Sequence, residues 1–198
     1  MVIIKIGGSL KSSKYIKLWI NSIKQRRDTS FLLIFGGGKY ANNVRKEQSR
    51  IKYNDYVAHK LAINSMRKFT NEVLKDIEDF TVVDSIQNIN KMHSKRKLLV
   101  WMPTVNEIDN FNIPANWDAT SDTISLAVAK ILNCPLLIIK SVKFNKKKFL
   151  NSFFLKDNLL DKYFTENHRS FTQLISIASR EKFYKLKKIC KDFNQISS

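Results

Sequence analysis

The sequence predicts an α/β fold, a three-layer α/β/α sandwich built around a mainly parallel open sheet. Two observations support this fold class. Continuous apolar runs rich in β-branched and aromatic residues occur at Val2–Ile6 and Phe31–Phe35, as expected of strands buried on both faces. All five glycines of the chain directly follow these two runs, and each glycine cluster leads into a segment with helical character. Strand, glycine loop and helix, used twice, are typical of a parallel sheet covered by helices.

Four further segments are expected to complete the sheet. Leu98–Trp101 and residues 135–139 have the composition of buried strands, and Thr81–Val83 is expected to add a short one. Residues 173–178 are the candidate for a last strand. We find no internal repeat and no long linker, so residues 1–198 are predicted to form a single domain.

Helices are predicted between these strands. Residues 53–77 show apolar positions at helical spacing, and residues 124–132 carry the apolar stripe of a helix packed on a sheet. Thr120 or Ser121 can cap the second of these helices, and Asp122 in its first turn suits the positive end of the helix dipole. Residues 181–189 are the candidate for a last helix, whereas 143–154 are basic and aromatic with little periodicity.

Composition excludes a membrane span and favours a globular protein. Hydrophobic residues make up 43% and charged residues 26% of the 198 positions, and no run reaches the roughly 18–20 apolar residues that a span requires. The chain starts directly on a strand, so no signal peptide is expected. Cys134 and Cys190 are too far apart to match a metal-binding motif, so we expect both to be reduced thiols. We therefore expect a cytoplasmic protein.

The chain is strongly basic, with 35 Lys and Arg against 17 Asp and Glu, a formal net charge of +18. This excess could attract nucleic acid or another polyanion. It could also be compositional, because Lys, Asn and Ile are all frequent, as in proteins of AT-rich genomes. The basic residues are spread from Lys5 to Lys191, and no recognised nucleic-acid-binding motif is present. A nucleic-acid partner is therefore not expected.

The first candidate site is the segment Lys5, Ile6, Gly7, Gly8 and Ser9. An unpaired ammonium inside a buried strand is costly, but Lys5 is tolerated if its head emerges beside a bound phosphate at the carboxyl end of the strand. Glycines let backbone N–H groups approach phosphate oxygens, and the N-terminus of a following helix adds a favourable dipole. The alternative is a tight turn that follows a strand with a solvent-reaching lysine.

The second candidate is the cluster Gly36, Gly37 and Gly38. Consecutive glycines destabilise regular structure through their conformational entropy, and this chain has only five. Close approach of the backbone to a ligand would explain three of them at one place. A turn that simply leads into a helix is the alternative.

The third candidate is residues 116–123, which place two carboxylates, hydroxyls and an amide around a helix start. Such a segment can orient catalytic lysines or, together with ATP, help to position Mg²⁺. It can also be an elaborate helix cap, since Asp, Thr and Ser are the residues that caps use.

These motifs resemble the signature regions of the amino-acid-kinase superfamily. The matching segments read VIIKIGGSL at residues 2–10, FGGGKYAN at 35–42 and NWDATSDTISLAVAK at 116–130. Residues 44–66 are similar to one branch, the aminomethyl-furanmethyl-phosphate kinases of methanofuran synthesis and their relatives in methylotrophic bacteria. The resemblance covers roughly residues 1–140. It implies an amino-acid-kinase-like fold and an ATP- and Mg²⁺-dependent kinase acting on a small anionic substrate, expected as a homo-oligomer.

The resemblance also implies residue roles. Lys5 would stabilise the transferring phosphoryl group, and Asp122 would orient the lysines rather than act as a strong base. Backbone and hydroxyl groups would bind the ATP phosphates at three positions, Gly7, Gly8 and Ser9. The anionic end of the acceptor would be held by Gly36, Gly37 and Gly38, with His59 and Trp117 placed near it. For His59, a solvent-facing position on its helix is the alternative.

The chain departs from the superfamily after its fourth strand. The superfamily has a Thr-Asp-Val-Asp-Gly-like turn that cradles the nucleotide, whereas residues 140–144 here read KSVKF, without either acid or the glycine. The chain beyond is also shorter, so the C-terminal nucleotide lobe is predicted to be reduced. Lys140 could instead supply a second phosphate-binding cation. A non-catalytic binding or assembly subunit with this fold, or less favourably a polyanion or RNA binder, remains as the alternative function.

Overall fold

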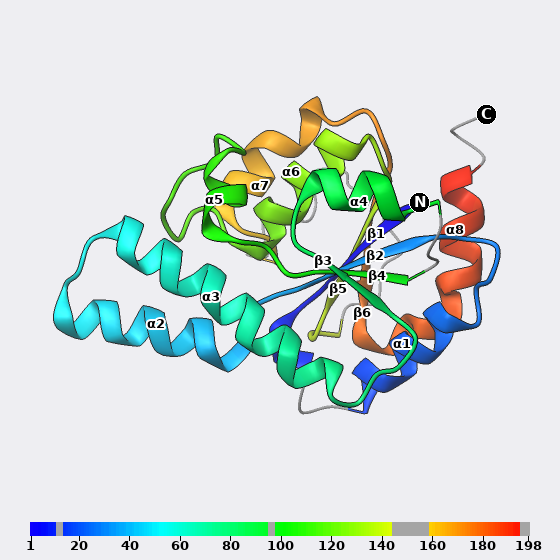
Figure 1. Ribbon diagram of the computed structural model, residues 1–198, viewed down its shortest axis with the longest axis horizontal. Coiled ribbons are helices and arrows are strands. Elements are labelled where there is room, and N and C mark those ends of the chain that lie inside the picture. The colour runs from blue at the N-terminus through cyan, green and yellow to red at the C-terminus, as the bar shows by residue number, and fades with distance from the viewer. Residues whose placement is uncertain (11–13, 95–97, 144–158, 195–198) are drawn as a thin grey trace.

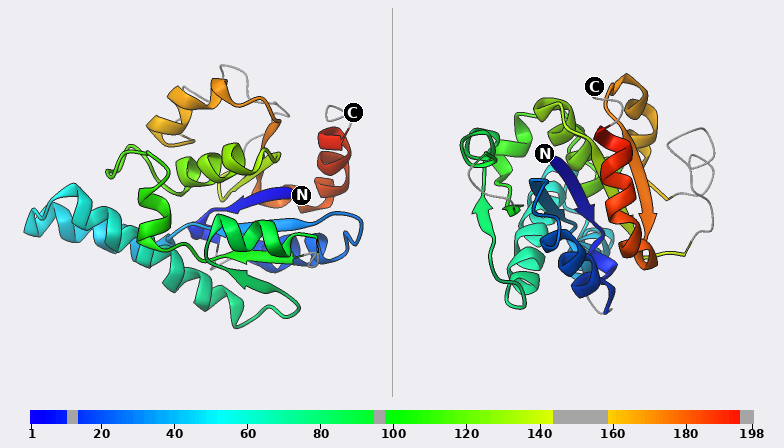
Figure 2. Two further views of the ribbon diagram at one scale, coloured as in Figure 1. Left: turned by 45° about the horizontal axis from the view of Figure 1, so that its top comes forward. Right: turned by 90° about the vertical axis from the view of Figure 1, so that its right-hand side faces the viewer.

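The computed structural model describes residues 1–10, 14–94, 98–143 and 159–194. It contains a six-stranded sheet in the order β3-β4-β2-β1-β5-β6, in which every pair of neighbouring strands is parallel (Figure 1). Helices cover both faces of this sheet (Figure 2). The predicted three-layer α/β/α fold is therefore confirmed.

The strands lie close to their predicted positions. β1 (Val2–Ile6), β2 (Phe31–Phe35), β3 (Thr81–Val83) and β4 (Leu98–Trp101) have the predicted bounds. β5 (Leu136–Lys140) and β6 (Ile175–Ser179) begin slightly later than predicted. Pro135 has no N–H to donate to the sheet, and its carbonyl accepts a hydrogen bond from the Ile3 N–H at 2.9 Å.

The helices of the described chain are α1 (Tyr15–Lys24), α2 (Gly38–Ile51), α3 (Asp55–Leu74), α4 (Ile86–Met92), α5 (Val105–Asp109), α6 (Ser121–Leu132), α7 (Lys162–Asn167) and α8 (Leu186–Asn194). The prediction of a last helix over 181–189 is partly wrong. A 3₁₀ turn occupies Arg180–Lys185, and Lys182 within it has φ −91° and ψ 20°, which is outside the helical region. The α-helix therefore starts only at Leu186.

Two apolar clusters hold the three layers together. One face of the central strands, with Ile4 and Leu33, packs against α1 and α8. The opposite face, with Ile3 and Leu32, packs against α4, α6 and α7. This alternation along each strand explains why the central strands read as continuous apolar runs, since both of their faces are buried.

α2 and α3 form an antiparallel pair that extends away from the carboxyl end of β2 (Figure 1). The left-handed conformation of Lys52, with φ 66°, ends α2. The side chain of Asn54 then accepts a hydrogen bond from the Val57 N–H and caps α3. This pair forms one wall of the site described below.

No helix within the described residues is long and apolar enough to cross a membrane. The basic stretch 143–154 lies outside the described residues from position 144 onward.

Candidate active site

The candidate site lies at the carboxyl edge of the sheet, where β1 is flanked by β2 and β5. α1, which follows β1, packs on one face of the sheet, and α6, which leads into β5, packs on the other. The chain thus leaves β1 and enters β5 on opposite faces. In open α/β sheets, a change of this kind opens a crevice outside the carboxyl ends of the strands, and ligands bind there.

Three charged side chains meet in this crevice. The ammonium of Lys5 on β1 donates to Asp122 Oδ1 at 2.6 Å, and the ammonium of Lys140 on β5 donates to Asp122 Oδ2 at 2.5 Å. Asp122 is in the first turn of α6 and is buried, as is Lys5, whereas Lys140 is partly exposed. One buried carboxylate therefore holds two cations, and the group carries a net positive charge.

The electrostatics keep the carboxylate ionised. Burial by itself would raise the pKa of Asp122, but the two ammonium groups outweigh burial and lower that pKa below its ordinary value. Burial lowers the pKa of Lys140, and the neighbouring charge of Lys5 lowers it further, against the opposing effect of Asp122 and Asp161. Lys140 therefore loses its proton more easily than an ordinary lysine does. This lowered pKa determines the pH dependence predicted in the Discussion.

The two glycine clusters contact each other beside this group. A Cβ on Gly8 would lie 2.2 Å from the backbone nitrogen of Gly38, which only glycine avoids. Gly38 has φ +54°, and a Cβ there would lie 2.7 Å from the ring of Phe69. A Cβ on Gly36 would lie 3.0 Å from Ser121 Oγ. Packing of the loops against each other and against α6 thus requires these glycines, independently of any ligand.

Hydrogen bonds within the protein already use part of the loop backbone. The Gly7 N–H donates to the Ile139 carbonyl at 3.0 Å, and the Gly36 N–H donates to the Ile6 carbonyl at 3.0 Å. Both bonds extend the sheet by one step, so these two N–H groups are not free for a phosphate or an acceptor. The hydroxyl of Ser9 donates to Ser141 Oγ at 2.7 Å and links the first loop to the turn after β5.

A cavity opens next to the glycine loops, between α3 and the start of α6. Its volume is about 480 Å³, a figure that includes the open space at its mouth. Small and apolar side chains form most of its wall, among them Ala41, Ala58, Ala62, Ile63 and Ile124. Gly37, His59, Trp117 and Ser121 also line it. Three of the five residues predicted for the acceptor, Gly37, His59 and Trp117, are thus brought to one cavity.

His59 is buried at the cavity wall, so the alternative of a solvent-facing histidine is excluded. Its Nε2 lies 3.7 Å from Asp109 Oδ1, and Asp109 also accepts a hydrogen bond from the Tyr56 hydroxyl at 2.9 Å. Burial lowers the pKa of His59, and the opposing charge of Asp109 does not restore it. The lowered pKa favours the neutral form of His59, which can both donate and accept a hydrogen bond.

Trp117 closes the cavity on the side of α2. Its indole N–H donates to Gln48 Oε1 at 2.5 Å, and the guanidinium of Arg45 stacks over its ring at 4.4 Å from the centroid. Gln48 in turn donates to Asp55 Oδ1 at 2.8 Å. The loop before α6 is thereby fastened to the α2–α3 pair.

Sequence reasoning missed Gln48, Asp109 and Asp161. Asp161 accepts hydrogen bonds from the start of α6 although it lies far along the chain. The only sequence signal at Asp161 is its place before a short helix, where an aspartate reads as an ordinary cap. Gln48 and Asp109 have no signal of their own in the sequence.

The residues that the structure describes do not form a protein-built magnesium site. Within the described ranges, no group of three or more His, Cys, Asp or Glu could hold a metal ion. Both oxygens of Asp122 accept from lysines, so its carboxylate is not free to ligate a cation. Mg²⁺ in kinases is bound largely through substrate phosphates, and we assign no step at this site to it.

The chain is similar in sequence to a curated kinase over much of its length. The chain is 29% identical over 140 residues to a (5-(aminomethyl)furan-3-yl)methyl phosphate kinase from Methanocaldococcus jannaschii. The match covers 70% of this chain and 64% of the relative, so the chain spans less than two thirds of that protein's length. No family model matches the chain.

Two solved structures share the fold over nearly the whole chain. The uridylate kinase from Archaeoglobus fulgidus superposes with a TM-score of 0.68 at 12% identity, covering 94% of this chain and 95% of that one. The UMP kinase from Bacillus anthracis superposes with a TM-score of 0.64 at 12% identity, covering 96% and 91%. At this identity the likeness establishes the fold and leaves the chemistry to be argued from the site.

Proposed function

We propose that this chain is an ATP-dependent small-molecule kinase, because its sequence is similar to a phosphate kinase, its fold is that of solved kinases, and its glycine segments resemble those of the amino-acid-kinase superfamily. It transfers the γ-phosphoryl group of ATP to a small anionic acceptor. The single observation that carries the proposal is the contact of Lys5 and Lys140 with opposite oxygens of Asp122, beside the two glycine loops.

This group is suited to phosphoryl transfer. The transition state spreads negative charge over the oxygens of the moving group, and catalysis depends mainly on positioning and neutralising that charge. Lys5 and Lys140 supply the cations, and Asp122 fixes both of them before the substrate arrives. Cations held in advance need no reorganisation during the reaction, which is where electrostatic catalysis gains most. Asp122 lies between two ammonium groups and has a lowered pKa, so it acts by orientation rather than as a base.

The nucleotide side consists of the first loop and the turn after β5. Gly8 and Ser9 provide the part of the first loop that is left to approach a phosphate, and the Ser9–Ser141 hydrogen bond joins the two segments. The acidic turn typical of the superfamily is absent from the sequence here. We propose that Lys140 partly replaces it by binding the phosphates directly.

The acceptor side is the cavity lined by His59 and Trp117. Its mainly apolar wall suits a compact ring, and the acceptor's anionic group would point toward Gly37, Ser121 and the lysines. The relative from Methanocaldococcus jannaschii is named for an acceptor of this kind, a furan ring with a methyl phosphate. We propose an aminomethyl-furanmethyl phosphate as the acceptor, in one-carbon cofactor biosynthesis. The protein would work in the cytoplasm as a homo-oligomer.

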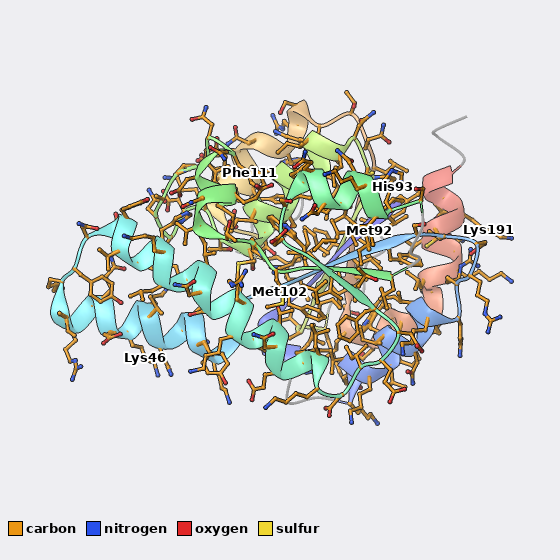
Figure 3. The ribbon with its side chains drawn as sticks, viewed as in Figure 1. Lys46, Met92, His93, Met102, Phe111 and Lys191 are labelled. Carbon is orange, nitrogen blue, oxygen red and sulfur yellow. The ribbon has the colours of Figure 1, made fainter. Side chains whose placement is uncertain are left out.

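The second candidate function is a non-catalytic binding or assembly subunit with the same fold. The missing acidic turn favours it, while the preformed group of Lys5, Asp122 and Lys140 favours the kinase. A polyanion binder has less support. Exposed lysines such as Lys46 on α2 and Lys191 on α8 lie at opposite ends of the molecule rather than on one face (Figure 3).

Calorimetry with a non-hydrolysable ATP analogue and Mg²⁺, followed by a turnover assay with a furan-methyl phosphate, tests the proposal. Binding of the analogue together with turnover supports the kinase. Absence of binding at millimolar concentration, with folded protein, would instead favour the non-catalytic subunit. Binding of nucleotide with no turnover on phosphate acceptors would reject the acceptor class and keep the nucleotide site.

A further inference from the structure

The side chain of Asp161, at the start of α7, accepts five hydrogen bonds. Four come from the start of α6, and the fifth caps α7 itself. Its Oδ2 accepts from the Thr120 N–H at 2.8 Å, the Thr120 hydroxyl at 2.7 Å and the Thr123 N–H at 3.0 Å. Its Oδ1 accepts from the Thr123 hydroxyl at 2.5 Å and the Phe164 N–H at 2.9 Å. The first turn of α6 is therefore capped by a side chain from another helix.

Asp122 lies between the residues that Asp161 binds. Thr120 is the N-cap position of α6, but its own side chain makes no capping bond and its hydroxyl donates to Asp161 instead. Helix N-termini leave their first N–H groups without partners inside the helix. Asp161 satisfies two such groups on either side of Asp122, and an anion is also favoured there by the helix dipole.

We propose that Asp161 is a positioning residue for phosphoryl transfer, which fixes the first turn of α6 and with it the carboxylate of Asp122 between Lys5 and Lys140. This inference rests on the proposed kinase function. It makes the start of α7 part of the site, although sequence reasoning expected only a reduced lobe in this part of the chain.

The bonding pattern requires a carboxylate rather than an amide. Each oxygen of Asp161 accepts from at least one backbone N–H, Thr120 and Thr123 on one side and Phe164 on the other. An asparagine has one oxygen and one NH₂ group, so either orientation points N–H groups at each other on one side. Asp161→Asn therefore breaks this arrangement while preserving the size of the side chain.

Asp161→Asn is the test, and Lys162→Gln is the matched control. Lys162 is the next residue, and its ammonium lies 3.2 Å from Asp118 in an exposed ion pair that joins the same two segments without contacting the α6 N–H groups. For Asp161→Asn we expect kcat to fall about 10- to 100-fold, as for a small misplacement of catalytic groups, with KM for both substrates nearly unchanged. Lys162→Gln should retain the wild-type kcat.

If Asp161 only stabilised the fold, Asp161→Asn would lower thermal stability without changing kcat of the folded protein. That result would overturn the proposal. If Asp161→Asn does not fold, Thr123→Val removes only the hydroxyl that donates to Oδ1 and keeps the three backbone N–H bonds to Asp161. We then expect a smaller loss in kcat, about three- to tenfold, again without a change in KM. A folded Thr123→Val protein with wild-type kcat would reject the role of Asp161.

A readout that needs no turnover separates this inference from the kinase proposal. Lys140 faces Lys5, Asp122 and Asp161, and the charge of Asp161 supports its protonated form. The pKa of Lys140, followed by NMR of its ¹³Cε, should be lower in Asp161→Asn and unchanged in Lys162→Gln. If wild-type protein shows no turnover, the kinase proposal fails, and this titration still tests the inference. Because Asp161→Asn also removes a charge, the same titration of Thr123→Val, which keeps that charge, shows whether a change reflects position. An unchanged pKa of Lys140 in both variants overturns the role of Asp161.

Discussion

Gly8 and Gly38 touch through their backbones, since a Cβ on Gly8 would come within 2.2 Å of the Gly38 nitrogen. The family resemblance implies different substrates for these two loops, yet the loops pack together as one unit. The loops can lie this close only because neither glycine has a side chain. A substitution in either loop should therefore displace the backbone of the other.

We predict that Gly8→Ala destabilises the protein and reduces turnover. The new methyl group meets backbone atoms that cannot rotate away, and overpacking of this kind costs about 1–3 kcal/mol or more. Gly7→Ala is the comparison, because its Cβ would lie 3.3 Å from the Ile139 carbonyl oxygen, a tight but milder contact. Thermal denaturation should rank wild type above Gly7→Ala and Gly7→Ala above Gly8→Ala. Equal stability of all three proteins would show that the loops adjust freely.

Substitution of Lys5 should lower the chemical rate more than it lowers substrate affinity. A cation held against the transferring group acts most strongly in the transition state. For Lys5→Ala we expect kcat to fall about 10²- to 10³-fold, by analogy with removal of one preorganised donor, and ATP affinity to change much less. Lys5→Arg should also fail substantially, because a planar guanidinium does not replace a compact ammonium in a tight site.

Lys17→Ala is the control for Lys5, since Lys17 is an exposed lysine on α1 whose ammonium lies 3.7 Å from Asp76. It should retain wild-type turnover. Steady-state kinetics and separate nucleotide titrations make the comparison. Near-normal kcat in Lys5→Ala, or loss of its fold rather than its activity, would make Lys5 a structural residue.

The pH dependence of kcat should show an alkaline decline caused by Lys140. Its protonated form is the one that neutralises phosphate charge, and its pKa is lowered by burial and by Lys5. The decline should therefore begin below the ordinary lysine value of about 10.4. Lys140→Met should lower kcat and remove this limb. An unchanged alkaline limb in Lys140→Met would assign the titration to another group.

The free energy of unfolding should rise with pH in two separate windows, because the folded-state pKa values of both Asp122 and Lys140 are lowered. The folded-state pKa of Asp122 is lowered, so the stability it contributes is present above its ordinary value of about 3.9 and is lost as the pH falls through the folded pKa. The folded-state pKa of Lys140 is also lowered, so between that pKa and about 10.4 the unfolded chain binds more protons. Its contribution to stability therefore rises with pH in that window. Denaturant titrations of wild type and Lys140→Met measure the difference.

Ala62→Leu should block the acceptor and spare the nucleotide. Ala62 lines the cavity on α3, and added methylene groups in a small pocket change discrimination about 10- to 200-fold. We expect KM for the acceptor to rise at least tenfold within that range, with ATP affinity nearly unchanged. Leu61→Ala, at the adjacent exposed position on α3, is the control and should leave KM unchanged. A rise in KM in the control alone would place the acceptor outside this cavity.

The sequence by itself determined the strands, the glycine loops and the fold class. Each of these depends on local pattern: continuous apolar runs mark strands that are buried on both faces, and the glycines end them at the same edge. Lys5 and Asp122 could be singled out for the same reason, because Lys5 stands near a strand end and Asp122 at a helix start, whereas Lys140 was noticed only where the sequence departs from the superfamily it resembles. These positions are set by a few neighbouring residues.

Only the tertiary structure decided which of these groups meet. Lys5 and Asp122 are 117 residues apart in the sequence, and their contact exists because α6 crosses the sheet to bring β5 beside β1. The wall around His59, with Asp109 from α5, and the cap on α6 from Asp161 likewise depend on packing between distant segments. Asp161 could be read locally only as the cap of its own short helix, because the N–H groups of Thr120 and Thr123 reach it only in the folded chain.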